Sequence, residues 1–347
     1  MFTPILARQQ SHSTLSIPSL AQALLPGPRG LILGVLLVLL QVAPAFAEAP
    51  AQSEKQRIAA ASGIRLRATP APSGKEVTKL FIGTVLKVLE QTAKQETIGG
   101  KADYWYRVAT PEGQEGWVFG SLVWPLLPDQ QVQTYLEIAR QRMADEKTPF
   151  VDRADLVNFL KATVTQTPAK ESAAHLELAL WRAMRWTLAA LSEGNVPKSA
   201  YEKWVQRQGD ALVYSEPAGE WFVSGAFLWK LEEKYRGLPE AEALAWEAAT
   251  TTPPGECEGY APCYLAMSNS MEGEYLRRYP AGPHAGEALK ALQQGLGTDG
   301  ISDLDQEGRT DLREELGKLE AALGPVKLPE KKKALDQLQA LRKAAGK

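Results

Sequence analysis

The spacing of apolar residues changes at Pro125, and this change most constrains the fold. From Ser62 to Trp124 the chain has short apolar and β-branched runs separated by turn residues, as at 70–74 and 111–113. Beyond Pro125, apolar residues recur at steps of three and four. Short runs between tight turns are typical of strands, whereas steps of three and four are typical of amphipathic helices. The sequence therefore predicts a multidomain β + α protein, with a small β-barrel followed by an α-helical domain.

The β region holds five short apolar runs, and its many tight turns favour a small barrel over residues 62–125. The expected strands are Ile64–Arg67, Val77–Phe81, Thr84–Leu89, Tyr104–Val108 and Gly116–Val118.

Three motifs in this region resemble the bacterial SH3 (SH3b) domain. Residues 64–70 read Ile-Arg-Leu-Arg-Ala-Thr-Pro, residues 79–89 carry Gly83 within an apolar hairpin, and residues 105–118 hold Trp-Tyr-Arg-Val and Glu-Gly-Trp-Val. The chain departs from the family at Thr69, where Gly is usual, and by a long insert over 91–103. The resemblance implies an SH3-like barrel that binds a peptide or a peptidoglycan segment.

Alternation along the strand at 104–108 indicates which side chains face a ligand. It places Tyr104, Tyr106 and Val108 on one side, and Trp105 and Arg107 on the other. With Val108 in the core, Trp105 becomes an exposed ligand-binding residue. Resemblance to the family adds three neighbours, so the expected ligand-binding residues are Arg65, Arg67, Trp105, Arg107 and Trp117. The alternative is an ordinary half-exposed surface.

The first 47 residues have the order of a secretory signal peptide. Arg8 and Arg29 precede an uncharged apolar run at 31–40, and a small-x-small cleavage pattern follows at 45–47. The run is shorter than the roughly 20 apolar residues that a membrane anchor needs. We therefore expect a signal peptide at 1–47, a linker at 48–61, export to the periplasm or beyond, and no membrane span after cleavage.

The region after Pro125 predicts helical hairpins. Residues 235–241 (Tyr-Arg-Gly-Leu-Pro-Glu-Ala) and 279–285 (Tyr-Pro-Ala-Gly-Pro-His-Ala) match at an offset of 44. A repeat of this length is typical of α-solenoids, and the motif resembles the junctions of tetratricopeptide-like repeats. We expect an α-solenoid-like repeat domain at 130–297 that binds a protein partner, then an acidic linker and C-terminal helices at 298–347. Expected helices include Gly219–Tyr235, Ala261–Tyr279 and Thr310–Leu323.

Composition excludes several classes of chemistry. With 39 Lys and Arg against 41 Asp and Glu, the net charge of −2 argues against a dedicated nucleic-acid binder. Two Cys and three His are too few for a multi-ligand zinc cage, and no cofactor is expected. In an oxidising compartment Cys257 and Cys263 are expected to form a disulfide.

Two alternative sites remain open. Cys257 stands in a Glu-Cys-Glu-Gly-Tyr phrase that is similar to the nucleophile motif of cell-wall endopeptidases, with His175 or His284 as the possible base. Residues 303–314 space their oxygen ligands as a calcium loop does, but an acidic linker in which Thr310 or Asp311 caps the next helix explains them better. The possible calcium ligands are Asp303, Asp305, Glu307, Asp311 and Glu314.

Together these patterns favour a non-enzymatic binding or scaffolding protein of the cell envelope. The alternative is a cell-wall hydrolase that an SH3b module targets to the wall.

Overall fold

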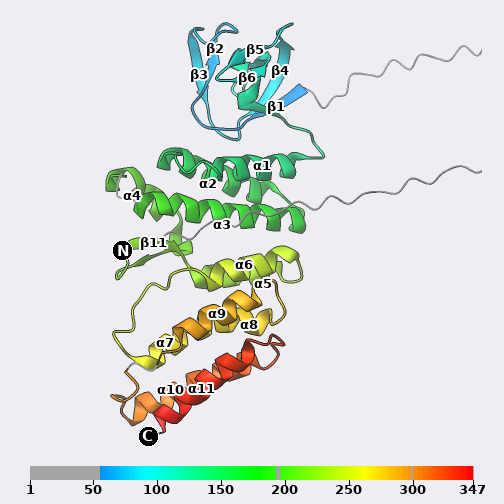
Figure 1. The fold of residues 1–347 in the computed structure, drawn as a ribbon. Coiled ribbons are helices and arrows are strands. Elements are labelled where there is room, and N and C mark those ends of the chain that lie inside the picture. The colour runs from blue at the N-terminus through cyan, green and yellow to red at the C-terminus, as the bar shows by residue number, and fades with distance from the viewer. Residues whose placement is uncertain (1–54, 193–195, 298–299, 347) are drawn as a thin grey trace, which may run out of the picture. The chain divides into compact units, whose positions relative to one another are not determined.

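The computed structural model describes residues 55–192, 196–297 and 300–346 (Figure 1). A β-sheet region comes first, and a helical region follows it. The expected signal peptide at 1–47 lies outside the described residues, as does most of the expected linker. Over the described ranges, no helix has both the length and the apolar character needed to span a membrane.

The β region is built on one antiparallel sheet of seven strands, in the order β3-β2-β8-β7-β4-β1-β9. A separate two-stranded hairpin, β5–β6, is formed within the insert that follows β4. The strands are β1 (Gln56–Ala59), β2 (Ile64–Arg67), β3 (Glu76–Leu80), β4 (Val85–Gln91), β5 (Glu96–Ile98), β6 (Lys101–Asp103), β7 (Trp105–Ala109), β8 (Glu115–Phe119) and β9 (Val123–Pro125).

Strand β1 corrects the expected linker at 48–61. It pairs with β4 on one side and with β9 on the other, so its backbone groups are satisfied from both directions. Ile58 and Ala59 are fully buried. The polar composition around this four-residue strand hid it, because only two of its side chains enter the core.

The core of the sheet follows the alternation read from the sequence. Its members come from alternate positions of β2, β7 and β8, and they include Leu66, Tyr106, Val108 and Val118. Trp105 and Arg107 are not among them. The expected division of β7 into a core face and an outer face is therefore confirmed.

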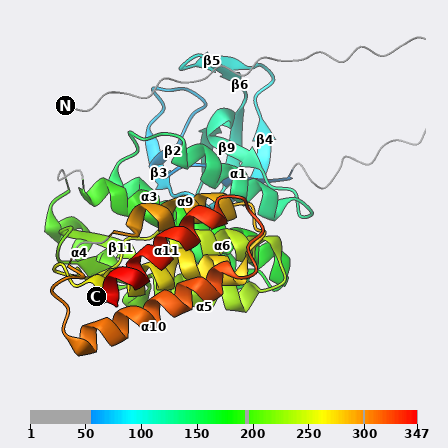
Figure 2. The same cartoon turned by 60° about the horizontal axis from the view of Figure 1, so that its bottom comes forward.

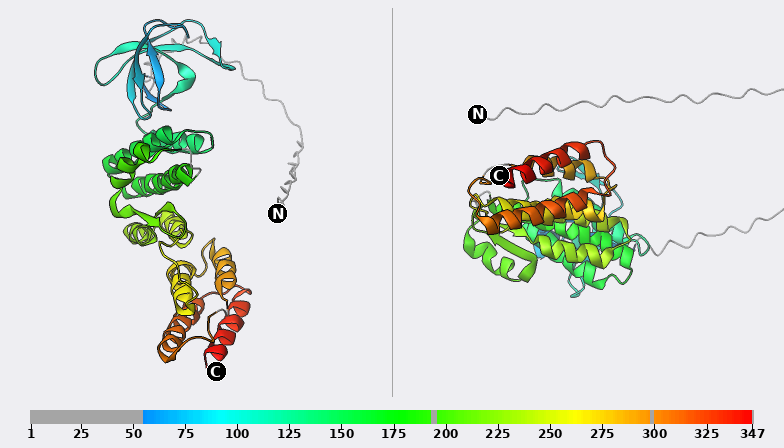
Figure 3. Two further views of the ribbon diagram at one scale, coloured as in Figure 1. Left: turned by 90° about the vertical axis from the view of Figure 1, so that its left-hand side faces the viewer. Right: turned by 90° about the horizontal axis from the view of Figure 1, so that it is seen from below.

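Most of the chain after Pro125 is helical, as the periodicity of its apolar residues predicts (Figure 3). Its helices are α1 (Gln131–Met143), α2 (Phe150–Gln166), α3 (Lys170–Ser192), α4 (Lys198–Gln206), α5 (Gly225–Tyr235), α6 (Pro239–Ala249), α7 (Ala261–Ser268), α8 (Glu274–Arg278), α9 (Ala285–Gly295), α10 (Gln306–Leu323) and α11 (Lys331–Ala345). A π-helical turn at Asn269–Gly273 divides the single helix expected over Ala261–Tyr279.

A β-hairpin interrupts the helices between α4 and α5. Its strands are β10 (Leu212–Ser215) and β11 (Glu220–Val223), which pair in antiparallel register. The helix expected from Gly219 therefore begins only at Gly225. Its start is set by Ser224, whose hydroxyl accepts a hydrogen bond from the backbone N–H of Phe227.

One core runs through α6 to α11. Ala245 of α6, Leu289 of α9, Leu316 of α10 and Leu338 of α11 belong to the same buried cluster. Helices α10 and α11 lie side by side (Figure 2). The expected boundary at residue 297 therefore separates no core, and α10 and α11 pack as part of the helical region.

The β region also packs on the first helices. Ile58 and Ile82 share a buried cluster with Leu156 of α2. The hydroxyl of Ser62 donates a 2.6 Å hydrogen bond to Asp155 of the same helix. The β region is thus held against α2 by both apolar and polar contacts.

The two helix junctions related by 44 residues make matching contacts. At each junction a tyrosine donates a hydrogen bond to a buried glutamate of an earlier helix, and the basic residue just before that tyrosine pairs with the same carboxylate. The first set is Lys234, Tyr235 and Glu177, and the second is Arg278, Tyr279 and Glu232.

Candidate functional site

All five predicted ligand-binding residues lie on the outer face of the sheet. In the strand register Trp117 lies opposite Arg67 on one side and opposite Arg107 on the other. Trp105 lies opposite Phe119. Arg65 and Arg67 are two positions apart on β2, so they share a face.

Trp105 is not exposed, which corrects the expectation from strand alternation. Its side chain is 2% exposed. The indole N–H donates a 2.9 Å hydrogen bond to Glu96 of β5, and the ring packs on Phe119 with centroids 5.5 Å apart. Alternation identified the correct face, but part of the 91–103 insert folds back as the β5–β6 hairpin and provides a partner for this side chain.

Trp105 and Phe119 line a groove of about 550 Å³ on this face. Its walls come from the turns around β2, from the β5–β6 hairpin and from the segment after β8. The lining residues are Ala61, Ser62, Gly63, Ile64, Arg65, Arg67, Pro72, Ile98, Gly99, Lys101, Trp105, Phe119, Ser121 and Leu122. The groove therefore joins three of the five predicted residues, Arg65, Arg67 and Trp105.

Ile98 and Lys101 were missed by the sequence analysis, although a signal for them exists. They flank Gly99-Gly100, and both glycines have positive φ, at 59° and 78°. Two consecutive residues with positive φ form the tight turn that joins hairpin strands, and Gly-Gly favours it. A hairpin within the insert could have been predicted from this dipeptide.

The groove carries three cationic side chains, and none of its lining residues is acidic. Arg65 pairs with Glu76 at 3.2 Å, and Arg67 donates to the backbone carbonyl of Gly74 at 2.7 Å. Lys101 has no ion-pair or hydrogen-bond partner for its ammonium group within the described ranges. Apolar lining residues beside an unpaired cation suit a ligand that has both an apolar group and a carboxylate.

Arg107 and Trp117 lie outside the groove lining. Arg107 donates to Glu115 at 2.8 Å and lies 3.8 Å from Glu90, so its charge is already compensated. These two residues form a separate row across the outer face. Arg67 belongs to the same row, because it lies opposite Trp117.

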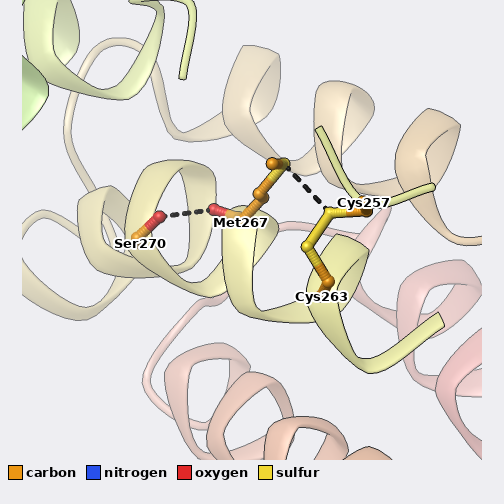
Figure 4. Close-up of a disulfide and its surroundings, with 4 residues drawn as sticks. All are labelled: Cys257, Cys263, Met267 and Ser270. Carbon is orange, nitrogen blue, oxygen red and sulfur yellow. Dashed lines mark hydrogen bonds between the residues drawn. A yellow bond between two sulfur atoms is a disulfide. The ribbon is translucent and has the colours of Figure 1, made fainter. Parts of the chain in front are cut away.

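Cys257 and Cys263 form the predicted disulfide (Figure 4). The sulfur of Cys257 lies 3.5 Å from that of Met267. A disulfide sulfur is not a thiolate, so Cys257 has no nucleophile to offer in this state. His284 contacts Glu242 at 2.8 Å and stacks on Trp246.

The possible calcium ligands are spread along a helix start. Asp305 caps α10 by accepting a 2.8 Å hydrogen bond from the N–H of Gly308, which replaces the expected caps at Thr310 or Asp311. Asp311 accepts from Tyr260, and Glu314 pairs with Lys318. Since α10 begins at Gln306, these residues do not follow a loop around an ion. The described residues contain no group of three or more potential metal ligands.

Comparison with known proteins agrees with the β region described above. Residues 62–123 match the family model of the bacterial SH3 domain. The chain matches no curated protein and no solved structure. The N-terminal β region is therefore SH3b-like, with the groove on the outer face of its sheet.

Proposed function

We propose that this chain is an exported, non-catalytic protein of the cell envelope that binds cell-wall peptide through its SH3b-like β region. The observation that carries the proposal is the groove on the outer face, with apolar residues, three cations and no carboxylate in its lining. Bacterial SH3 domains commonly bind cell-wall components, and the match at residues 62–123 supports the same role here.

The groove favours a peptide that carries carboxylates. Pro72 and Leu122 in its lining offer exposed apolar surface to an apolar side chain, and Lys101 offers an ammonium group without a competing acidic partner. Arg67 donates to the neutral carbonyl oxygen of Gly74, and this hydrogen bond does not neutralise its positive charge. A carboxylate that lies between these two cations gains charge-assisted hydrogen bonds.

The helical region has a different role in this proposal. Its paired helices form an α-solenoid-like support that binds a protein partner of the cell envelope, while the SH3b-like β region binds the cell wall. The Tyr235 and Tyr279 junctions, 44 residues apart, each bind a buried glutamate of an earlier helix, which favours related hairpins, although the two glutamates are 55 residues apart.

Co-sedimentation with purified peptidoglycan tests the proposal. The chain from residue 48 onward should pellet with peptidoglycan, and Lys101→Glu should reduce the bound fraction about tenfold by placing a carboxylate against the ligand's own. Lys94→Glu is the matched control, because Lys94 is an exposed lysine of the same insert that does not line the groove. Equal binding by both variants and the wild type would exclude the groove as the site.

A further inference from the structure

A second pocket lies in the helical region, between α4 and the β10–β11 hairpin. It has a volume of about 630 Å³, which is within the range of small-molecule sites. Its lining residues are Lys198, Tyr201, Glu202, Val205, Gln206, Gly209, Tyr214 and Trp221. Neither the match to the SH3 family nor the groove described above includes any of them.

The hairpin is built to hold aromatic rings at this pocket. Leu212 and Val223 form a cross-strand pair that is buried in the helical core. Two positions further along the hairpin, on the same face, Tyr214 lies opposite Trp221, and their ring centroids are 5.2 Å apart. The buried pair anchors the strands, and the aromatic pair faces the pocket. Tyr214 remains 39% exposed, so its ring is accessible from solvent.

The other wall is held in place by the core. Trp204 of α4 is buried against Phe150, with ring centroids 5.4 Å apart. Tyr201 and Gln206 line the pocket from the same helix. The two walls therefore present rings from rigid elements, an arrangement that reduces the entropy lost when a ligand binds.

The polar groups of the pocket are available to a ligand. Within the part of the chain that the structure describes, the hydroxyls of Tyr201 and Tyr214 and the amide of Gln206 have no hydrogen-bond partner. Lys198 and Glu202 lie 3.9 Å apart, so the lining carries no net charge. This balance contrasts with the cationic groove of the β region and favours an uncharged ligand.

We propose that this pocket binds a neutral pyranose unit of a glycan. The C–H faces of a sugar ring stack on flat aromatic surface, and its hydroxyls both donate and accept hydrogen bonds. A proline-rich peptide also fits between aromatic side chains, but its prolines have no N–H and can only accept. The Glu202 carboxylate only accepts, so it finds a donor in a sugar hydroxyl and none in the backbone of consecutive prolines.

Calorimetric titration of the chain from residue 48 onward tests this proposal with three soluble probes: an N-acetylglucosamine tetramer, cellotetraose and decaproline. We expect at least one of the two tetrasaccharides to bind. Trp221→Ala and Tyr214→Ala should each weaken that binding about tenfold. Glu202→Gln should weaken it several-fold. Tyr264→Ala is the control, because Tyr264 is an exposed tyrosine outside this pocket.

The proposal fails if neither sugar binds at millimolar concentration, if decaproline binds in their place, or if sugar binding survives in both aromatic variants. Circular dichroism checks that each variant is folded, and Tyr214→Ala carries the test if Trp221→Ala unfolds. Lys101→Glu should leave the sugar titration unchanged. Loss of peptidoglycan co-sedimentation in Lys101→Glu, with the sugar titration unchanged, therefore shows that the groove and this pocket are separate sites.

Discussion

The hydroxyl of Tyr279 donates a 2.9 Å hydrogen bond to Glu232, a carboxylate that is 1% exposed. Tyr235, 44 residues earlier, does the same for Glu177 at 3.0 Å. Tyr235 is the last residue of α5 and Tyr279 directly follows α8, and each glutamate belongs to an earlier helix. A buried carboxylate therefore ties each of these junctions to an earlier helix.

Removal of the Glu232 carboxylate should destabilise the helical region strongly. Glu232→Ala removes a buried carboxylate that pairs with Arg278 and Arg236 and accepts the Tyr279 hydrogen bond, although Arg278 keeps its contact with Glu274. We expect the free energy of unfolding to fall by about 3 kcal/mol, as measured by urea denaturation. Glu233→Ala is the matched control on the same helix, since Glu233 is 57% exposed and should cost no more than about 0.5 kcal/mol. Equal losses for the two variants would contradict the proposed role of Glu232.

Stability should depend on pH through the same residue. Burial raises the pKa of Glu232, but hydrogen bonds from Arg236 and Tyr279 and the charge of Arg278 outweigh burial and hold the pKa below 4.5. The unfolded state therefore binds a proton more readily, and the carboxylate contributes stability above its unfolded pKa. This contribution is lost as the pH falls through the lowered pKa of the folded state.

Thermal unfolding measured between about pH 6 and pH 3 checks this. The Tm of the wild type should fall more steeply than that of Glu232→Gln on acidification, so the gap between them narrows. A gap that stays constant would show that another carboxylate controls acid stability.

Trp105 should affect stability as well as binding. Its burial between Phe119 and the β5–β6 hairpin predicts that Trp105→Ala lowers the free energy of unfolding by about 3 kcal/mol or more. Trp117→Ala, on the same face but only partly buried, should cost clearly less. Chemical denaturation of both variants measures the difference. A loss under about 1 kcal/mol for Trp105→Ala would indicate a surface position.

Gly83 should be sensitive to substitution for two separable reasons. Its φ of 85° strains any other residue, and an added Cβ would meet the ring of Phe159 on α2. Gly113 has a similar φ of 82° with open space around it, so Gly113→Ala should cost about 1 kcal/mol from strain alone. Gly83→Ala should cost about 2 kcal/mol more in thermal or urea unfolding. Equal costs would mean that the β region does not pack on α2 in solution.

The disulfide should be present in unreduced protein. Peptide mass spectrometry should find Cys257 and Cys263 crosslinked, and quantitative alkylation of both thiols would contradict this. The bond closes a short loop, with a sequence separation of 6. Its reduction should therefore lower the free energy of unfolding by only about 2 kcal/mol.

Local patterns predicted the faces of the strands but not what covers them. Alternation correctly placed Trp105 and Val108 on opposite faces of their strand, because side-chain direction is a property of the strand itself. The burial of Trp105 depends on Glu96, nine residues away in a polar segment that reads as a loop. Tertiary contacts of this kind carry no local periodicity.

The β10–β11 hairpin was missed for a related reason. The apolar residues of Glu220–Val223 run directly into the helical pattern of α5, so periodicity alone extends the helix to Gly219. The boundary depends on the cap at Ser224 and on pairing with β10. The second candidate pocket was missed with it, since Tyr214 and Trp221 meet only through that pairing.

The β5–β6 hairpin pairs with no strand of the main sheet. Its residues are absent from the apolar core of the β region, yet Ile98 and Lys101 form one wall of the groove. Selection can therefore act on ligand preference and on folding separately. An exchange of residues 97–102 that keeps Glu96 against Trp105 would therefore change the lining of the groove without rebuilding the main sheet.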